Sequence, residues 1–265
     1  MITRFAPSPT GPLHLGHAYS AMLAHDMATE AGGTFLLRIE DIDRQRSKPE
    51  WVARILDDLR WLGLTWPEPV LHQSARRAAY DAALDRLWQT TLLFECACTR
   101  SDIYLAASAP QEGARLGPDG VVYPGTCRHR HPSRPVTRAR PGGVLRLDMA
   151  RAMANFGIST FDERIVTPSS AARRTGDRMI REVGDIVVQR RDYGTSYHLS
   201  VVVDDAHQGV TDVVRGEDLL EATFIHTVLQ GLLGLHRPRY HHHRLIRDDA
   251  GRRLAKRDDS RALSL

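Results

Sequence analysis

The stretch that decides the fold is Ala6-Pro7-Ser8-Pro9-Thr10-Gly11-Pro12-Leu13-His14-Leu15-Gly16-His17. It follows a segment from Ile2 to Ala6 that alternates as a short strand does. The prolines and the glycine between residues 7 and 12 exclude a helix until about Leu13. From His14 to Thr29 the spacing predicts a helix, whose apolar side we expect to contain Leu15, Ala18, Met22 and Met27. A strand therefore leads through a rigid turn into a helix.

This turn has the properties of a phosphate-binding site. The first backbone N–H groups of a helix lack partners within it and carry a partial positive charge, so they attract anions. His14 and His17 lie three positions apart and point to one side, where both can donate to phosphate oxygens. Gly16 has no side chain, so a flat base can lie against the backbone. The alternative, two surface histidines beside a loop, leaves the rest of the string unexplained.

The elements that follow alternate between strand and helix. Thr34 to Ile39 is predicted as a buried strand. A capping box of Ser47 and Glu50, with Pro49 in the first turn, opens a helix that Gly63 ends. The apolar faces of this helix and the next contain Val52, Ile55, Leu56, Leu59 and Leu62, and then Tyr80, Ala83, Leu84, Leu87 and Trp88. This order favours an α/β fold with a parallel sheet covered by helices.

The pattern is interrupted between Cys96 and Gly176, where glycine, proline and arginine are frequent, so we expect an insertion there. Beyond it, Asp185 to Gln189 and Leu199 to Val203 are predicted as buried strands, and Leu219 to Leu233 as a helix ended by Gly234. The predicted organisation is a nucleotide-binding sheet split into residues 1–95 and 177–245. The insertion takes residues 96–176 and a final segment takes residues 246–265.

The composition is ordinary for a soluble globular protein, with 42% hydrophobic and 26% charged residues. No signal peptide and no apolar run of the roughly 18 residues that a membrane span needs is present, so we expect a cytoplasmic protein. The net charge of +4 is compatible with polyanionic partners. Two groups of arginines suit phosphate backbones and predict contact with RNA: Arg128, Arg130, Arg134, Arg138 and Arg140, and then Arg173, Arg174, Arg178 and Arg181.

Three strings resemble the class I aminoacyl-tRNA synthetases, in the form found in glutamyl-tRNA synthetases. Residues 6–17 resemble the HIGH signature of that family, and Arg38-Ile39-Glu40-Asp41-Ile42-Asp43-Arg44 is similar to its second strand and the turn that follows. Residues 197–219, which contain Asp204-Asp205 and Val214-Arg215-Gly216-Glu217-Asp218, are similar to its second half-domain. The resemblance covers nearly the whole chain. It implies a Rossmann-like parallel sheet that is split by a small zinc-containing insertion.

The resemblance also implies an enzyme that activates glutamate with ATP and Mg²⁺. It assigns Arg4 and Arg215 to the two carboxylates of the amino acid, Glu40 to its ammonium group and Tyr197 to a hydroxyl contact. These roles agree with the chemistry, since a guanidinium group can bind a carboxylate through two charged hydrogen bonds. The residues expected to contact ATP are His14, Gly16, His17 and Lys256, and His14, His17 and Lys256 are the expected catalytic residues.

The chain departs from the family pattern at two places. The mobile lysine loop, the KMSKS signature, is matched by Arg252-Arg253-Leu254-Ala255-Lys256-Arg257, in which Arg253 replaces the first lysine and Ala255 the serine. Thr223-Phe224-Ile225-His226 stands where relatives usually have a Thr-Pro-Arg-Gln-like string, so an arginine and a glutamine are missing there. The run His241-His242-His243 could bind a metal, but its place in the pattern favours a structural or phosphate-side role.

The three cysteines predict a structural zinc site. Cys96-x-Cys98 and Cys127 supply three thiolates, and Tyr123 and His129 are the two candidates for a fourth ligand. Zinc prefers four tetrahedral ligands, and closed sites of this kind stabilise small insertions that lack a core. Buried cysteines without a metal are the alternative. The resemblance to short relatives of glutamyl-tRNA synthetase favours Tyr123.

Only Arg257–Leu265 follow Lys256, where glutamyl-tRNA synthetases continue into an anticodon-binding region. The chain therefore resembles their short paralogues, and we expect it to be shortened at its carboxyl end even relative to these. The implied activity is activation of glutamate without tRNA and transfer to the queuosine base in the anticodon loop of tRNA(Asp). The alternatives are a shortened glutamyl-tRNA synthetase catalytic domain that charges tRNA(Glu) and an inactive tRNA-binding paralogue. We expect a monomer that does not bind membranes.

Overall fold

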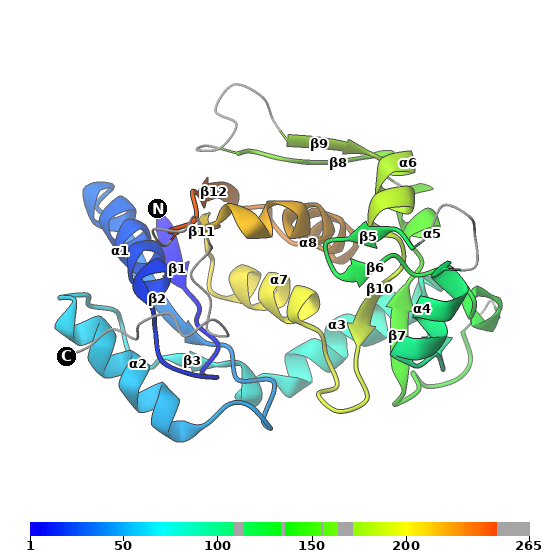
Figure 1. Cartoon of the computed structure of the whole chain (residues 1–265), viewed down its shortest axis with the longest axis horizontal. Coiled ribbons are helices and arrows are strands. Elements are labelled where there is room, and N and C mark those ends of the chain that lie inside the picture. The colour runs from blue at the N-terminus through cyan, green and yellow to red at the C-terminus, as the bar shows by residue number, and fades with distance from the viewer. Residues whose placement is uncertain (109–113, 134–135, 155, 164–171, 248–265) are drawn as a thin grey trace.

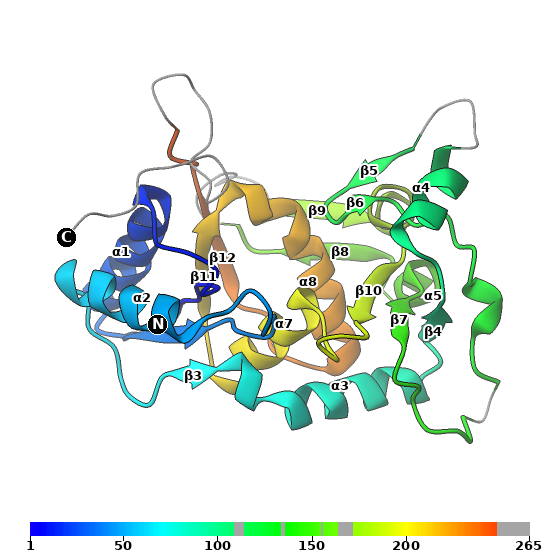
Figure 2. The same cartoon turned by 60° about the horizontal axis from the view of Figure 1, so that its bottom comes forward.

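The amino-terminal elements form a small parallel sheet with helices beside it. The computed structural model describes residues 1–108, 114–133, 136–154, 156–163 and 172–247. In it β1 (Ile2–Phe5) pairs in parallel with β2 (Thr34–Ile39), and β2 pairs in parallel with β3 (Leu71–His72). Helices α1 (Leu15–Glu30) and α2 (Pro49–Trp61) lie at the same end of the molecule (Figure 1, Figure 2). The strand, turn and helix predicted from residues 2–29 are confirmed.

The buried face of α1 agrees only in part with the prediction, since Ala18 is buried and Met27 packs against the core as expected, but Leu15 and Met22 do not. Its buried residues are Ala18, Ala21, Ala24 and Ala28, whereas Leu15 and Met22 are 55% and 41% exposed. Small side chains allow the helix to lie close to the sheet, and the hydroxyl of Thr3 on β1 donates to the carbonyl of Ala24 at 2.7 Å. Steric fit against the strands therefore decides this face rather than side-chain hydrophobicity.

Helix α2 begins without the expected capping box. Its N-cap residue is Lys48, which makes no side-chain capping bond, and Pro49 occupies the first turn as predicted. The predicted apolar face is confirmed, since Ile55 and Leu59 are fully buried. Gly63 follows the helix with a φ of 78°, which glycine adopts readily. The next helix, α3 (Arg77–Gln89), buries Tyr80, Leu84, Leu87 and Trp88, again as expected.

An antiparallel sheet lies at the other end of the molecule (Figure 1). It contains β4 (Leu93–Cys96), β7 (Val144–Leu147) and β10 (Ile186–Gln189) in the order β10-β7-β4. The predicted strand at Asp185 to Gln189 is thus confirmed, but it pairs with β7. The elements around this sheet are α4 (Arg100–Ser108), α5 (Met149–Ala154), α6 (Gly176–Arg178) with a π-helical turn (Met179–Val183), and the paired strands β5 (Leu116–Gly117) and β6 (Gly120–Val121). A second pair, β8 (Ile158–Phe161) and β9 (Ala172–Thr175), is also antiparallel.

The carboxyl-terminal strands return to the first sheet. β11 (Asp212–Gly216) pairs in parallel with β12 (Arg239–His243), and the N–H of Thr211 donates to the carbonyl of Ile2 at 2.9 Å, next to β1. A 3-10 turn (Glu217–Leu219) leads into α8 (Leu220–Leu233), which ends at Gly234 in the left-handed conformation, as predicted. Parallel strands from both ends of the chain therefore lie beside one another.

The prediction of a strand at Leu199 to Val203 is wrong. These residues belong to α7 (Tyr197–His207), which begins at Ser196, whose hydroxyl accepts from the N–H of Leu199 at 3.3 Å. A short apolar run rich in valine fits a buried strand and a buried helix equally well. The helix forms here because Ser196 caps it and because both of its sides are covered, so that Leu199, Val201 and Val202 are all buried.

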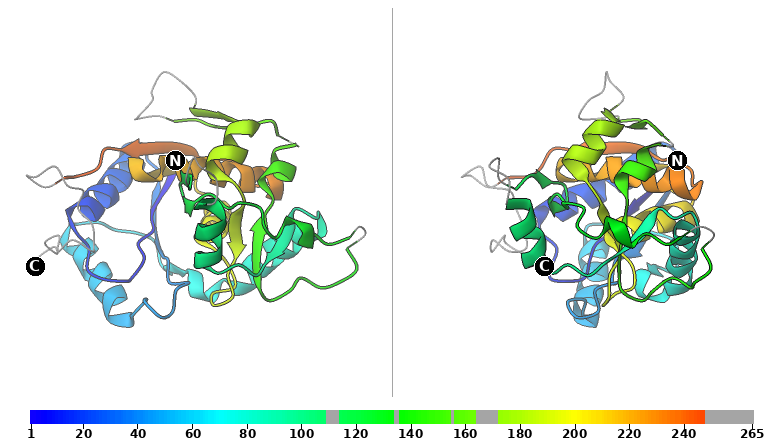
Figure 3. Two further views of the ribbon diagram at one scale, coloured as in Figure 1. Left: turned by 45° about the vertical axis from the view of Figure 1, so that its right-hand side comes forward. Right: turned by 90° about the vertical axis from the view of Figure 1, so that its right-hand side faces the viewer.

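Helices α7 and α8 lie between the two ends of the molecule (Figure 1, Figure 2). Apolar side chains of α3, α7, α8 and the antiparallel sheet form the larger core, and those of α1, α2, β1 and β2 form a second one. The β8–β9 hairpin runs along α8 (Figure 3), where the hydroxyl of Ser159 donates to the carbonyl of Phe224 at 3.1 Å. Among the described residues, no helix has the length and apolar character to cross a membrane.

Candidate functional site

The two histidines of the amino-terminal turn close the first turn of α1. Nδ1 of His14, the N-cap residue, accepts from the N–H of Gly16 at 3.1 Å, and Nδ1 of His17 accepts from the N–H of His14 at 3.2 Å. The two rings stack with their centroids 3.7 Å apart. Since each Nδ1 accepts, each neutral ring carries its proton on Nε2. A Cβ at Gly16 would lie 3.1 Å from the His14 ring, so this position favours glycine.

The structure brings the predicted substrate-binding residues of the described chain to one cavity of about 640 Å³. The end of α1 contributes His14, Gly16 and His17, while β1 contributes Arg4. The remaining predicted residues in its lining are Glu40, Tyr197 and Arg215. Lys256 lies outside the described residues.

Two guanidinium groups of this site are neutralised within the protein. Arg4 Nε lies 3.0 Å from the Asp205 carboxylate, and Arg38 lies 2.7 Å from Asp205 and 3.2 Å from Glu40. Burial would raise the pKa of Asp205, but the charges of Arg4 and Arg38 outweigh it and lower that pKa. Burial raises the pKa of Glu40, and the opposing effects of Arg38 and Arg4 are smaller.

Arg215 has a different environment. In the part of the chain that the structure describes, no carboxylate forms an ion pair with it. Its guanidinium donates to the carbonyl of Leu219 at 3.3 Å, to Thr223 Oγ1 at 2.5 Å, and to His226 Nδ1 and His242 Nε2 at 3.3 Å each. Arg4 and Arg38 are thus in direct contact with Asp205 and Glu40, whereas Arg215 has no carboxylate in direct contact among the described residues. The guanidinium of Arg215 is therefore suited to pair with a carboxylate of a ligand.

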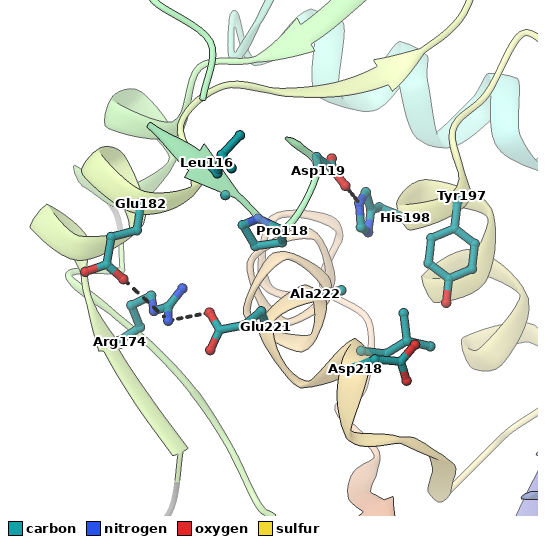
Figure 4. Close-up of a pocket in the computed structure, with 12 residues that line it drawn as sticks. Leu116, Pro118, Asp119, Arg174, Glu182, Tyr197, His198, Asp218, Glu221 and Ala222 are labelled. Carbon is teal, nitrogen blue, oxygen red and sulfur yellow. Dashed lines mark hydrogen bonds and ion pairs between the residues drawn. The ribbon is translucent and has the colours of Figure 1, made fainter. Parts of the chain in front are cut away.

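Tyr197 stands at the start of α7, where it separates this cavity from a second one. The second cavity, of about 520 Å³, is lined by Asp119, His198 and Glu221 among others (Figure 4). The Tyr197 ring lies 5.8 Å from that of His226, and burial raises the pKa of its hydroxyl. Its hydroxyl is therefore a neutral hydrogen-bonding group between the two cavities.

The three cysteines form a compact cluster. The Sγ atoms of Cys96, Cys98 and Cys127 lie within 4.8 Å of one another. The Tyr123 hydroxyl lies 3.6 Å from Cys96 Sγ and 3.5 Å from Cys98 Sγ, whereas His129 is exposed and its Nδ1 lies 3.1 Å from the carbonyl of Thr126. Burial would raise the pKa of Cys127, but hydrogen bonds from Tyr123 and the Ala97 N–H outweigh it and hold that pKa at about 7. Of the two candidate fourth ligands, only Tyr123 lies against the sulfur atoms.

The family model described as "tRNA synthetases class I (E and Q), catalytic domain" matches residues 1–264. The chain belongs to this family. The class I synthetase fold expected from the motifs is thereby confirmed at the level of an α/β domain with a parallel sheet.

Similar proteins agree with this assignment. The synthetase is 64% identical, over its whole length and 94% of the other protein, to the glutamyl-Q tRNA(Asp) synthetase of Rhodobacter capsulatus. It is 42% identical to the glutamyl-Q tRNA(Asp) synthetase of Nocardia farcinica, over 98% of this chain and 77% of that protein. A crystal structure of the glutamate-tRNA synthetase of Elizabethkingia anophelis matches 97% of this chain with a TM-score of 0.75 and 26% identity. The synthetase spans about half of that longer chain, 53%.

The structure also shows residues of the synthetase to which the motifs gave no role. Asp205 and Arg38 lie within the quoted strings, but their pairing with Arg4 and Glu40 depends on tertiary contacts. His226 lies in the string Thr223-Phe224-Ile225-His226, which departs from the expected family pattern, and it contacts Arg215. The only hint in the sequence was this departure from the family string.

Most arginines of the two groups for which RNA contact is predicted form ion pairs within the synthetase. Arg128 pairs with Asp185 at 2.7 Å, and Arg140 pairs with Asp81 at 2.8 Å. Further pairs join Arg138 to Glu95, Arg174 to Glu182 and Glu221, and Arg178 to Glu182. These side chains connect elements of the insertion to their neighbours, while Arg130, Arg173 and Arg181 are exposed. Arg134 lies outside the described residues.

Proposed function

We propose that this synthetase activates glutamate with ATP in the absence of tRNA and transfers it to the queuosine base of tRNA(Asp). The observation that carries the proposal is the cavity at the start of α1, which brings Arg4, Arg215 and Glu40 into one lining. Glutamate has two carboxylates and one ammonium group, so two guanidinium groups and one carboxylate match its charged groups in sign. The 64% identity to a glutamyl-Q tRNA(Asp) synthetase over the whole chain supports the choice of acceptor.

In this proposal Arg215 and Arg4 bind the carboxylates of glutamate and Glu40 binds its ammonium group. Arg4 keeps donors for this role, since Asp205 takes only its Nε and one N–H of Nη2. The Tyr197 hydroxyl supplies a further contact. Glutamine would leave buried charges unpaired, and such sites discriminate by roughly 10⁴-fold.

The end of α1 would hold the phosphates of ATP. The Nε2–H groups of His14 and His17 would donate to phosphate oxygens at the positively charged end of the helix, and Lys256 would add a cation. Mg²⁺ bound with ATP would neutralise phosphate charge. An oxygen of the glutamate α-carboxylate attacks the α-phosphorus, and pyrophosphate leaves with the electron pair of the broken bond. The chain contributes positioning and charge stabilisation rather than a covalent nucleophile.

In the second step, a hydroxyl of the acceptor attacks the activated carbonyl carbon. An ester bond forms, AMP leaves with the electron pair of the cleaved anhydride, and the hydroxyl proton passes to the AMP phosphate or to water. The second cavity beside Tyr197 provides an approach to the carbonyl (Figure 4).

We further propose that Cys96, Cys98, Cys127 and Tyr123 hold a structural zinc ion in the insertion of residues 96–176, between half-domains of residues 1–95 and 177–245. Three sulfur atoms and one phenol oxygen form a compact donor set of the size that tetrahedral zinc requires. The ion would connect β4 to the loop that contains Tyr123 and Cys127.

Exchange of labelled pyrophosphate into ATP tests the activation step. We expect exchange with glutamate in the absence of tRNA, and none with glutamine. Exchange that requires tRNA(Glu) would instead support a glutamyl-tRNA synthetase. Binding of tRNA without any exchange would support an inactive paralogue.

A further inference from the structure

Arg215 is connected to two carboxylates through histidines. Its side chain extends from β11, and its register partner on β12 is His242. Arg215 Nε donates to His242 Nε2 at 3.3 Å, and His242 Nδ1 forms a short hydrogen bond to the buried carboxylate of Glu163. Since an arginine can only donate, this bond requires an unprotonated Nε2, and the proton of the neutral ring then lies on Nδ1. Thr223 Oγ1 lies 2.9 Å from the same Nε2 and can donate to it as well.

The second connection is longer and leads to the second cavity. Arg215 Nη1 lies 3.3 Å from His226 Nδ1, His226 Nε2 lies 3.0 Å from His198 Nδ1, and His198 Nε2 lies 2.8 Å from Asp119. Figure 4 shows the last of these contacts, at the turn between β5 and β6. Because Arg215 donates at one end and the carboxylate accepts at the other, each ring accepts at Nδ1 and donates at Nε2.

We propose that these two histidine relays, Glu163–His242 and Asp119–His198–His226, position Arg215 for the glutamate carboxylate and do so only while His226 and His242 are neutral. The inference rests on the proposed function in that Arg215 is taken to bind the substrate. Each relay places an accepting nitrogen against the guanidinium without neutralising it directly. Within the part of the chain that the structure describes, four of the five N–H groups of Arg215 donate to protein atoms, one on Nε, one on Nη1 and two on Nη2. The second N–H of Nη1 is assigned to the substrate.

The relays explain how a buried arginine can remain charged for its ligand. Arg4 and Arg38 each have a carboxylate in direct contact, so much of their charge is satisfied before substrate binds. An imidazole between the guanidinium and a carboxylate fixes the orientation of the guanidinium. It also separates the negative charge from Arg215 by one ring in the case of Glu163, and by two rings in the case of Asp119. The substrate carboxylate then becomes the first anion that Arg215 meets.

Protonation would break both relays. A second proton on His226 would lie on Nδ1, and one on His242 on Nε2, so that each ring would point a donor at Arg215. The charged and titratable groups around the two rings are Arg215, His198, Tyr197, Arg4, Glu163, Tyr240 and His243. Burial, then Arg215 and the neighbouring histidines, lowers the pKa of His226 well below 6.5. Burial also lowers the pKa of His242, although Glu163 opposes this.

Imidazole ¹⁵N spectra test the relays without any substrate. At pH 7 we expect both histidines to be neutral, with His226 protonated on Nε2 and His242 on Nδ1; loss of each signal in the His226→Asn or His242→Gln variant provides the assignment. A doubly protonated ring, or the opposite tautomer at either position, would overturn the proposal. This outcome does not depend on whether the chain activates glutamate.

Kinetics separate positioning from a merely structural role. Losing a hydrogen bond to a charged group should raise the glutamate KM by about 10- to 100-fold in His226→Leu, while the ATP KM changes less than about 2-fold. His226→Asn keeps an acceptor near the Nδ1 position, and we expect it to restore most of the glutamate KM and to abolish the part of its pH dependence due to His226. His207→Leu, at an exposed position of α7, is the matched control. Equal rises of both KM values, or no rescue by Asn, would contradict the relay.

Discussion

The guanidinium of Arg4 and the carboxylate of Asp205 form a buried ion pair, with Nε 3.0 Å from Oδ1. Both side chains are at least 95% buried, and the two residues lie 201 positions apart in the chain. Arg38 shares the same carboxylate at 2.7 Å, so Asp205 joins β1, β2 and α7 below the proposed glutamate pocket. Arg4 therefore has a role in the fold in addition to its proposed contact with glutamate.

These two roles can be separated by a double substitution. Asp205 keeps its contact with Arg38 in Arg4→Met, so we expect this variant to lower the free energy of unfolding in urea by less than the about 3–5 kcal/mol of a fully unpaired buried charge, and to abolish glutamate-dependent exchange. Arg4→Met combined with Asp205→Asn removes the excess buried negative charge and should recover part of the stability, but no exchange. Recovery of exchange in the double variant would show that Arg4 acts only through the fold.

Glu40, the proposed partner of the glutamate ammonium group, should lower the free energy of unfolding at neutral pH. Burial raises the pKa of Glu40 in the folded state, so the protonated side chain stabilises the fold at pH values below its unfolded pKa near 4.5. This stabilisation is lost as the pH rises through the folded pKa. At pH 7 we expect Glu40→Gln to be more stable than the parent by on the order of 1 kcal/mol, and inactive in exchange. The difference in stability should shrink at pH 4. Glu50→Gln, on the exposed start of α2, is the control.

A substitution of His14 can remove its proposed catalytic role and retain its structural role as the N-cap of α1. Asparagine is a good N-cap residue, so His14→Asn should retain the start of α1 and change the unfolding free energy by less than about 0.5 kcal/mol. It lacks the Nε2–H that would meet a phosphate oxygen, and loss of one such donor costs about 10²- to 10³-fold in rate. An unchanged exchange rate in a folded His14→Asn variant would place the phosphates elsewhere.

Metal analysis of purified variants tests the zinc site. We expect one zinc ion per chain in the parent protein and in His129→Ala, because His129 points away from the sulfur atoms. Cys127→Ser should lose the metal and melt at a lower temperature, since structural zinc contributes directly to folding. Tyr123→Phe should bind zinc more weakly in competition with a chelator. Normal zinc in Tyr123→Phe together with loss in His129→Ala would reverse the choice of fourth ligand.

The amino-terminal strand, turn and helix could be predicted because their signals are local. Proline, glycine and the two histidines act within a dozen positions, and the structure retains this order as β1, a turn and α1. The buried faces of α2 and α3 followed from helical spacing in the same way. By contrast, the face of α1 depends on how closely it approaches the sheet, which no periodicity of apolar residues reveals.

The rest of the site depends on contacts between distant segments. The relation of Arg4 to Asp205, and of Arg215 to His226 and His242, arises only when β1, β11, β12, α7 and α8 come together. The α7 segment was mistaken for a strand because its valines fit either element, so the side chains that it directs inward could not be placed. Chemical roles could be proposed from the sequence, whereas the partners that set the charges of those residues could not be predicted from it.

Transfer of labelled glutamate tests the central claim most directly. The parent protein, ATP and glutamate are incubated with tRNA(Asp) that carries queuosine, with the same tRNA lacking it, and with tRNA(Glu), and the labelled nucleotide is then located. We predict label on the queuosine nucleoside of tRNA(Asp) and on neither of the other two RNAs. Label at the 3′ end of tRNA(Glu), or none on queuosine-containing tRNA(Asp) although glutamate is activated, would contradict the account.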